Sequence, residues 1–250
     1  MIEIRDLTKK YGTFTAVDHL NLEVRPGEIF GFLGPNGAGK TTTIRIIAGL
    51  SLPTHGQVLV AGLDVANEPV RAKALMGYVP DRPYLYEKLT GRELLQFVVN
   101  LYSKEWADCE ERALSLLRYF DLGDWIDSRI ENLSHGMKQK LVIVSALVHD
   151  PDILVIDEPM VGLDALAQRQ VRRLFRQLAE QHKTVLLTTH TLSIAEAVCD
   201  RIAIIHRGRI VATGTTASLK EAAGQSGSAL EDVFLSLTYD ETSGAAGEWS

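Results

Sequence analysis

The octapeptide GPNGAGKT at residues 34–41 constrains the fold more than any other feature of this chain. It matches the phosphate-binding template G-x-x-x-x-G-K-[ST] at every fixed position. The template requires a buried strand before it and a helix after it. Residues 28–33 are mostly apolar like such a strand, and residues 42–48 have the pattern of a helix that stops at Gly49. We therefore predict a strand, loop and helix that bind a nucleoside triphosphate.

Each part of the octapeptide has an expected task. The glycines let successive backbone N–H groups point at the phosphates, and the following helix adds the positive end of its dipole. Lys40 is expected to reach the β- and γ-phosphates, and the Thr41 hydroxyl is expected to contact Mg²⁺. The predicted phosphate contacts come from Asn36, Gly37, Ala38, Gly39, Lys40, Thr41 and Thr42. A plain glycine-rich turn is the alternative, and the flanking strand and helix argue against it.

A second site is predicted where the sequence ILVIDEP at residues 153–159 reaches two carboxylates. The aliphatic residues before the acids describe a buried parallel strand, whose carboxyl end faces the ligand crevice in an α/β sheet. We expect Asp157 to hold Mg²⁺ through water and Glu158 to accept a proton from an attacking water. By themselves the two acids would also fit a solvated strand end, but a phosphate-binding loop on the same chain favours hydrolysis.

A third motif, LSHGM at residues 133–137, precedes an apolar helix running from about Lys138 to Val148. Ser134 is well placed as the N-cap of that helix, which is a purely structural role. The same geometry also makes an anion site, since a serine hydroxyl, a glycine N–H and a helix N-terminus point one way. Because the octapeptide already serves one set of phosphates, this second anion site is expected to complete a different nucleotide.

Composition narrows the functional class. A net charge of −6 argues against a dedicated nucleic-acid binder, which normally shows a basic stripe. The two cysteines, Cys109 and Cys199, lie far apart and have no ligand-like neighbours, which fits a reducing, cytoplasmic setting. The longest aliphatic run, residues 141–148, is far short of the roughly 20 residues needed to cross a bilayer. We therefore expect a chain that spans no membrane by itself.

The patterns along the chain predict an α/β nucleotide-binding core with additions. Antiparallel β decoration is suggested by alternating segments in residues 1–27. Further strands are predicted at residues 28–33, 57–62, 153–157, 184–189 and 201–206. Helical patterns occupy residues 91–120 and 166–180. The alternation of strand and helix after residue 153 predicts a parallel sheet into which a helical block is inserted.

Beyond residue 218 the sequence predicts less order. Residues 219–238 are expected to be a flexible stretch followed by one short helix, whose apolar face would consist of Leu230, Val233, Phe234 and Leu237. Residues 239–250 have the composition of a disordered tail.

The motifs together resemble the ATP-binding subunits of ABC transporters in their order and spacing. They are Tyr11-Gly12, GPNGAGKTT at 34–42, LSHGM at 133–137, ILVIDEP at 153–159, VGLD at 161–164, and His190 after a strand. The resemblance covers residues 1–218 and implies a P-loop NTPase (RecA-like) core, with an antiparallel β subdomain and an inserted α-helical subdomain at about residues 84–145. Residues 85–93 and 230–235 resemble the bacterial export-type branch.

The resemblance implies a role for each motif residue. Tyr11 would stack its ring on adenine. Ser134 and Gly136 would grip the γ-phosphate of ATP bound to a second subunit, so that two chains enclose two ATP molecules. His190 would contact the γ-phosphate and help orient the attacking water, and Asp164 would link the two sites across the dimer. The structural alternatives are a half-buried tyrosine, a structural histidine and a helix N-cap at Asp164.

Two motifs depart from the family pattern. Most relatives carry a glutamine that touches Mg²⁺ where this chain has Asp81, which is shorter and charged. An acid there can still face Mg²⁺, although a simple turn between the flanking prolines fits the sequence equally well. The commonest signature has glycine and glutamine where this chain has His135 and Met137. Since the serine and the second glycine of the signature remain, we expect hydrolysis to survive.

The resemblance implies an ATPase that powers an ABC transporter, with export as the direction. ATP would close a dimer of this chain with an identical or closely related subunit, and hydrolysis would reopen it to move membrane-spanning permease subunits. The chain would lie at the cytoplasmic face of the cell membrane, held there by those partners. Its cofactors would be ATP and Mg²⁺, and nucleic acid is not expected as a partner.

Three rival functions fit this sequence less well than transport. A soluble ABC ATPase of DNA repair, chromosome handling or translation usually carries a second nucleotide-binding domain, a coiled-coil insertion or a cysteine-rich metal module, none of which this sequence shows. A P-loop GTPase would need an Asn-Lys-x-Asp guanine motif, which the sequence lacks. A non-hydrolysing binding module would not explain Glu158 together with His190.

Overall fold

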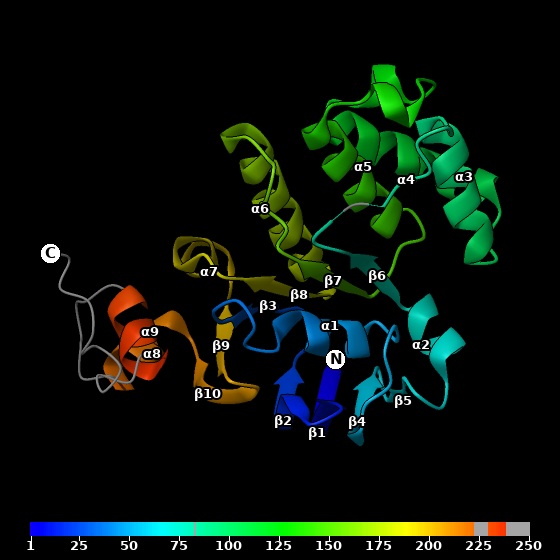
Figure 1. The fold of residues 1–250 in the computed structure, drawn as a ribbon. Helices are drawn as coiled ribbons and strands as arrows, with labels where there is room; N and C mark the ends of the chain where they lie inside the picture. Colours follow the sequence, from blue (N-terminus) through cyan, green and yellow to red (C-terminus); the bar gives the residue numbers. More distant parts are fainter. Residues whose placement is uncertain (83, 223–229, 239–250) are drawn as a thin grey trace, which may run out of the picture.

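The central sheet of the computed structural model, which describes residues 1–82, 84–222 and 230–238, has six strands in the order β10-β9-β3-β8-β7-β6 (Figure 1). They are β3 (Ile29–Leu33), β6 (Met76–Val79), β7 (Ile153–Asp157), β8 (Thr184–Thr189), β9 (Arg201–His206) and β10 (Arg209–Gly214). Neighbouring strands pair in parallel, except that β10 is antiparallel to β9. The predicted parallel sheet is therefore confirmed.

The two faces of this sheet are covered by different layers. Helix α1 (Lys40–Ile47) and a second sheet pack on one face, and α5 (His135–Leu147) and α6 (Ala165–Glu180) pack on the other (Figure 1). Strand β7 is covered on both faces, because Leu154 and Ile156 face α5 while Val155 faces the layer of α1. A strand covered on both sides needs apolar residues throughout, which explains its uninterrupted aliphatic run.

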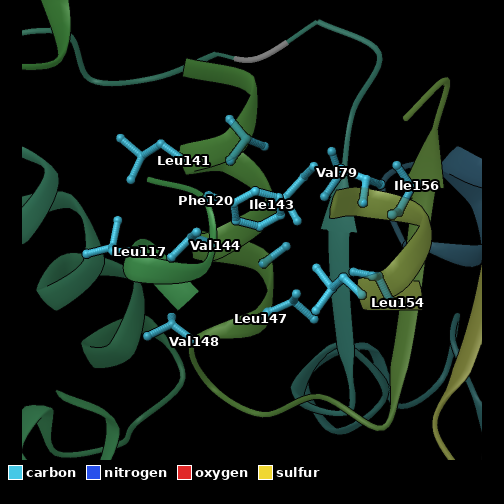
Figure 2. Packing of buried hydrophobic residues seen from close by; sticks show 14 of the residues in the cluster. Val79, Leu117, Phe120, Leu141, Ile143, Val144, Leu147, Val148, Leu154 and Ile156 are labelled. Atoms are coloured by element: carbon cyan, nitrogen blue, oxygen red, sulfur yellow. The ribbon is translucent and has the colours of Figure 1, made fainter. Parts of the chain in front are cut away.

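Figure 2 shows the layer between α5 and the sheet. Leu154 and Ile156 of β7 and Val79 of β6 belong to the same buried cluster as Ile143 and Leu147 of α5. Burial of such side chains is worth about 1.5–3 kcal/mol each relative to exposure. This apolar layer therefore fastens the helical part of the chain to the strand that carries the predicted acids.

The second sheet is antiparallel, in the order β2-β1-β4-β5. Its strands are β1 (Ile2–Tyr11), β2 (Phe14–Val24), β4 (His55–Val60) and β5 (Leu63–Asp64). A two-residue turn joins β1 to β2, and Gly12 provides the positive φ (+58°) that such turns require. Because Tyr11 pairs with Phe14 across this turn, two aromatic rings lie at the tip of the sheet.

A helical block lies between β6 and β7. It contains α3 (Gly91–Leu101), α4 (Trp106–Tyr119), two 3-10 turns (Gly123–Trp125 and Ile130–Asn132) and α5, while α2 (Pro69–Ala74) precedes β6. Helix α3 begins at a capping box, in which Thr90 and Glu93 exchange hydrogen bonds. Helix α5 begins at His135 rather than near residue 138, because the Ser134 hydroxyl accepts a hydrogen bond from the Met137 N–H at 3.3 Å.

The C-terminal helices correct one expectation. Residues 219–222, which the composition predicts to be flexible, are the end of α8 (Thr216–Ala222), where Leu219 is buried. Helix α9 (Leu230–Thr238) packs Leu230, Val233 and Phe234 into a cluster with Ala195 of α7 (Leu192–Val198). Residues 223–229 and the predicted tail 239–250 lie outside the described residues. Among the helices that the structure describes, none is long and apolar enough to cross a membrane.

His149, just after α5, joins the helical block to the central sheet. Its ring stacks on Tyr102, the residue that follows α3, with 3.5 Å between ring centroids, and its Nε2 lies 3.1 Å from the Met76 carbonyl oxygen of β6. Nδ1 is buried and has no hydrogen-bond partner within the described part of the chain. Burial lowers the pKa of His149 to about 4, with Lys104 and Lys183 adding to the effect and the Met76 carbonyl and Asp150 opposing it.

We expect the free energy of unfolding to fall as the pH is lowered from about 6.5 to about 4. In that window unfolded His149 takes up a proton while folded His149 resists it, which amounts to at most about 3 kcal/mol. Urea unfolding of the wild type and of His149→Gln between pH 7 and pH 4.5 measures this contribution, since the other titrating groups are common to both. Equal pH dependence in the two proteins would contradict the assignment.

Candidate functional site

The phosphate-binding loop connects β3 to α1 and is shaped by its glycines. A Cβ at Gly34 would lie 2.4 Å from the Ile205 carbonyl oxygen, and one at Gly39 would lie 2.6 Å from the Ala16 carbonyl oxygen. Gly39 also has a φ of +108°, which residues with side chains rarely adopt. No side chain caps the first turn of α1, so its backbone N–H groups are available to an anion.

Lys40 opens α1 and lies inside the loop rather than in solvent. Its ammonium donates to the carbonyl oxygens of Gly34 at 2.7 Å and Pro35 at 3.2 Å. Burial lowers the pKa of Lys40, and the nearby carboxylates of Glu158 and Asp157 oppose that shift. The loop therefore holds one buried cation beside two acids, and an incoming phosphate could replace the carbonyl oxygens as its partner.

Asp157 ends β7 and is almost completely buried. One carboxylate oxygen accepts a hydrogen bond from the Thr188 hydroxyl, while the other, Oδ2, is buried without a partner in the described residues. An unpaired buried carboxylate oxygen is costly, so this atom fits a site that a cation or its water completes. No group of three or more His, Cys, Asp or Glu in the described ranges would hold a metal alone. The donor set thus suits Mg²⁺, which takes most of its ligands from water and phosphate.

Glu158 follows in an unusual backbone conformation, with a φ of +53°. Non-glycine residues rarely adopt this left-handed region, and such positions concentrate at functional sites. Its Oε1 lies 2.7 Å from Nδ1 of His190, which follows β8. The histidine thus fixes the orientation of the carboxylate that was predicted to act as the base.

These side chains line one pocket of about 370 Å³. The predicted residues that it brings together are Tyr11, Asn36, Gly37, Gly39, Lys40, Thr41, Thr42, Asp81, Asp157, Glu158 and His190. Ala38 does not line it, because its side chain is buried and its carbonyl accepts a hydrogen bond from the Gly208 N–H at 2.9 Å. Asp81 lies in the same pocket as Asp157, and its contact with Mg²⁺ stays a prediction.

Phe14 is a pocket residue that the sequence reasoning missed. It lines the pocket beside Tyr11, and both rings are more than half exposed. The Nζ of Lys9 lies 5.0 Å from the Tyr11 ring centroid, a cation–π distance. The signal was available in the sequence, since a glycine turn between two aromatic residues predicts a hairpin that pairs them.

Ser134, Gly136 and Asp164 lie outside the pocket of their own chain. Ser134 caps α5, and Asp164 caps α6 by accepting a hydrogen bond from the Ala167 N–H at 2.8 Å. The structural alternatives noted for these two residues are therefore real contacts in this chain. Exposed Ser134 nevertheless remains able to meet a ligand from outside.

The signature turn touches the loop that carries Asp164. The His135 ring lies against Gly162, where an added Cβ would come within 2.5 Å of Nε2. Gly162 also has a φ of +77°, so both its backbone and the neighbouring His135 ring favour glycine at this position. The departure from the commonest signature noted in the sequence thus has a definite packing partner.

Comparisons with known sequences agree with this geometry. The family model described as "ABC transporter" matches residues 17–161. A probable multidrug ABC transporter ATP-binding protein of Escherichia coli is 38% identical over 96% of this chain, which spans 42% of that protein's length. A daunorubicin/doxorubicin resistance ATP-binding protein of Streptomyces peucetius is 42% identical over 89% of this chain and 68% of its own length.

Solved structures similar to this chain are also ATP-binding parts of ABC transporters. An ATP-binding subunit of an ABC transporter superposes with a TM-score of 0.91, at 35% identity, and covers 96% of this chain and 100% of its own. A dimeric ATP-binding cassette in a post-hydrolysis state with bound ADP and phosphate superposes with a TM-score of 0.78, at 26% identity, over 86% of this chain and 98% of its own.

Proposed function

Since the chain belongs to the ABC transporter family, we propose that it binds and hydrolyses ATP to power the export of a substrate across a membrane. The observation that carries this proposal is the single pocket in which the buried Lys40, the unpaired oxygen of Asp157, and the Glu158–His190 pair converge. Lysine, carboxylate and base in one pocket are what in-line transfer of a phosphoryl group to water requires.

The residues of the pocket divide the work among them. Lys40 and the N–H groups of the first turn of α1 hold the phosphates, and the Tyr11 ring stacks on the adenine ring. Thr41 and Asp157 would hold Mg²⁺, which when bound neutralises charge on the phosphate oxygens. Glu158 accepts a proton from the attacking water, and His190 keeps the Glu158 carboxylate in place.

We further propose that a second ATP-binding subunit supplies Ser134 and Gly136 to complete each site. This is supported by their absence from the pocket of their own chain and by the exposure of Ser134. A structural neighbour at 26% identity is dimeric with bound ADP and phosphate. Two chains facing each other would then enclose ATP between the loop of one and the signature of the other.

Transport is favoured over a soluble role by the relatives. Proteins named for daunorubicin/doxorubicin resistance and for Nod factor export are 42% and 40% identical to this chain. The test is co-purification from detergent-solubilised membranes, where a stable membrane-spanning partner is expected. Consistent recovery with ribosomes or DNA instead would overturn the transport proposal in favour of the soluble class.

We propose that a second hollow, of about 320 Å³, is the groove in which the membrane-spanning partner docks. It is lined by Ala48, Leu50, Lys73, Met76, Tyr78, Val98, Leu101, Tyr102, Ser145, Ala146 and Val155. Leu50 and Leu101 are more than half exposed, although leucine is favoured inside. Lys73 makes no ion pair within the described residues, so an apolar helical segment of the partner that carries an acid would match the groove.

The groove adjoins the nucleotide pocket through β6. Tyr78 of this strand lines the groove, and burial together with the charges of Asp157 and Asp81 raises its pKa to about 12. A partner segment that contacts Tyr78 would therefore lie close to Asp81, which is predicted to face Mg²⁺. If the partner docks there, a change at the nucleotide pocket would reach the membrane subunit through β6 alone.

We expect Leu101→Asp to reduce the membrane partner recovered with this chain by about tenfold or more, because it places a charge in an apolar contact. Leu101 is 65% exposed, so the variant should fold. The matched control is Leu235→Asp, which changes an exposed leucine (43%) on α9, and α9 lies on the opposite side of the molecule from α3, the helix that carries Leu101 (Figure 1). Equal partner recovery with the two variants would remove the groove as the docking site.

A further inference from the structure

Thr188, in β8, makes one hydroxyl contact to each of the two site acids. It pairs with Asp157 across the β7–β8 ladder and is completely buried. Its hydroxyl donates to Oδ1 of Asp157 and accepts a hydrogen bond from the backbone N–H of Glu158 at 3.1 Å. The Thr188 carbonyl oxygen lies 3.3 Å from the same N–H.

The direction of these hydrogen bonds is fixed by chemistry. A hydroxyl has one proton, and an ionised carboxylate only accepts, so the proton of Thr188 points at Asp157. A lone pair of the same oxygen is then free to accept the Glu158 N–H. Thr188 thereby occupies Oδ1 of Asp157 and leaves Oδ2, which is buried and has no partner among the described residues, as the oxygen available to a cation.

The second contact, between the Thr188 hydroxyl and the Glu158 N–H, holds the backbone of the proposed general base. Glu158 has a φ of +53°, a conformation that persists only when its surroundings hold it. The backbone N–H of Glu158 is held by Thr188, while its carboxylate is held by His190 at 2.7 Å. The strained residue is therefore fixed at both ends, and one end depends on Thr188.

We propose that Thr188 is a positioning residue for ATP hydrolysis: its hydroxyl sets the free oxygen of Asp157 toward Mg²⁺ and holds Glu158 in its left-handed turn. The inference rests on the proposed function and deepens it, because Thr188 does not line the nucleotide pocket and would act only through Asp157 and Glu158. The alternative is a purely structural role, in which Thr188 is a buried, hydrogen-bonded residue whose replacement only destabilises the sheet.

Thr184 separates the two possibilities. It lies in the same strand, is equally buried, and donates its hydroxyl to the Arg25 carbonyl oxygen at 3.3 Å, away from both acids. Thr184→Val therefore removes a buried β8 hydrogen bond without altering the site. Thr188→Val removes the hydroxyl at nearly constant volume, and Thr188→Ser restores it.

The experiment compares these variants of the full chain in ATP turnover, in the Mg²⁺ concentration at half-maximal ATP binding, and in unfolding midpoint. For Thr188→Val we expect kcat to fall about tenfold or more and the Mg²⁺ requirement to rise several-fold, with ATP affinity without Mg²⁺ unchanged. Thr188→Ser should stay close to wild type in all three measurements. Thr184→Val should lose stability alone.

The proposal is overturned if Thr188→Val keeps the wild-type kcat and Mg²⁺ dependence, or if Thr184→Val lowers kcat equally. Should Thr188→Val not fold, Thr188→Ala is measured in the same way and the same outcomes apply. Failure of the proposed function is a different result, because the wild type would then show no turnover. The Mg²⁺ dependence of ATP binding would still test Thr188 in that case.

Discussion

Glu158→Gln is expected to lower the rate of ATP hydrolysis by about 10²- to 10⁴-fold, the usual worth of a positioned general base. The amide cannot take a proton from water at neutral pH, yet it has nearly the same size as the carboxylate. Its oxygen can still accept a hydrogen bond from His190, so the pocket should keep its shape. ATP affinity should therefore remain close to that of the wild type.

The same variant should accumulate as a closed dimer with MgATP, because in the proposed cycle ATP binding closes two chains and only hydrolysis reopens them. Phosphate release and light scattering measure the two effects separately. The matched control is Glu28→Gln, which changes a buried acid that pairs with Arg201 at 3.0 Å outside the pocket. Wild-type turnover in Glu158→Gln, or equal loss in the control, would remove Glu158 as the base.

The sequence predicted those parts of the site that are encoded by neighbouring residues. Local sequence was enough to predict the strand, loop and helix around residues 34–41 and the strand before Asp157. Their apolar runs and closely spaced glycines are each contained within a few neighbouring residues. The parallel sheet followed from the alternation of such runs with helices. Each of these patterns needs no information about distant parts of the chain.

The contacts that the sequence did not predict all join distant segments. Thr188 meets Asp157 only because β7 and β8 are neighbours in register, and aliphatic strands carry no mark of their pairing order. His149 reaches Met76 across 73 residues for a similar reason. The end of α8 was not predicted because Leu219 packs into a cluster with residues of other elements, and this tertiary contact stabilises the helix. The small residues around Leu219 give no local sign of that contact.

Lys40→Ala is expected to weaken ATP binding by about tenfold to a hundredfold, the worth of one or two hydrogen bonds between charged groups. The physical reason lies in the ammonium's present partners. Lys40 donates to the Gly34 and Pro35 carbonyls at 2.7 and 3.2 Å while burial lowers its pKa, so a phosphate that takes their place gains a desolvated cation. The loss of Lys40 should therefore lower the affinity for ATP, whereas the loss of the Glu158 carboxylate should lower the rate of hydrolysis.

Lys183 provides the matched control for that measurement. It is a poorly exposed lysine that also donates to a backbone carbonyl, that of Pro151 at 2.8 Å, and it pairs with Asp150 outside the pocket. Lys183→Ala should therefore lose stability without losing affinity for a fluorescent ATP analogue. If Lys40→Ala bound nucleotide as tightly as wild type, the loop at residues 34–41 would not be the phosphate site. Since Glu158→Gln should retain ATP and Lys40→Ala should lose it, the pair of variants separates binding from hydrolysis in one pocket.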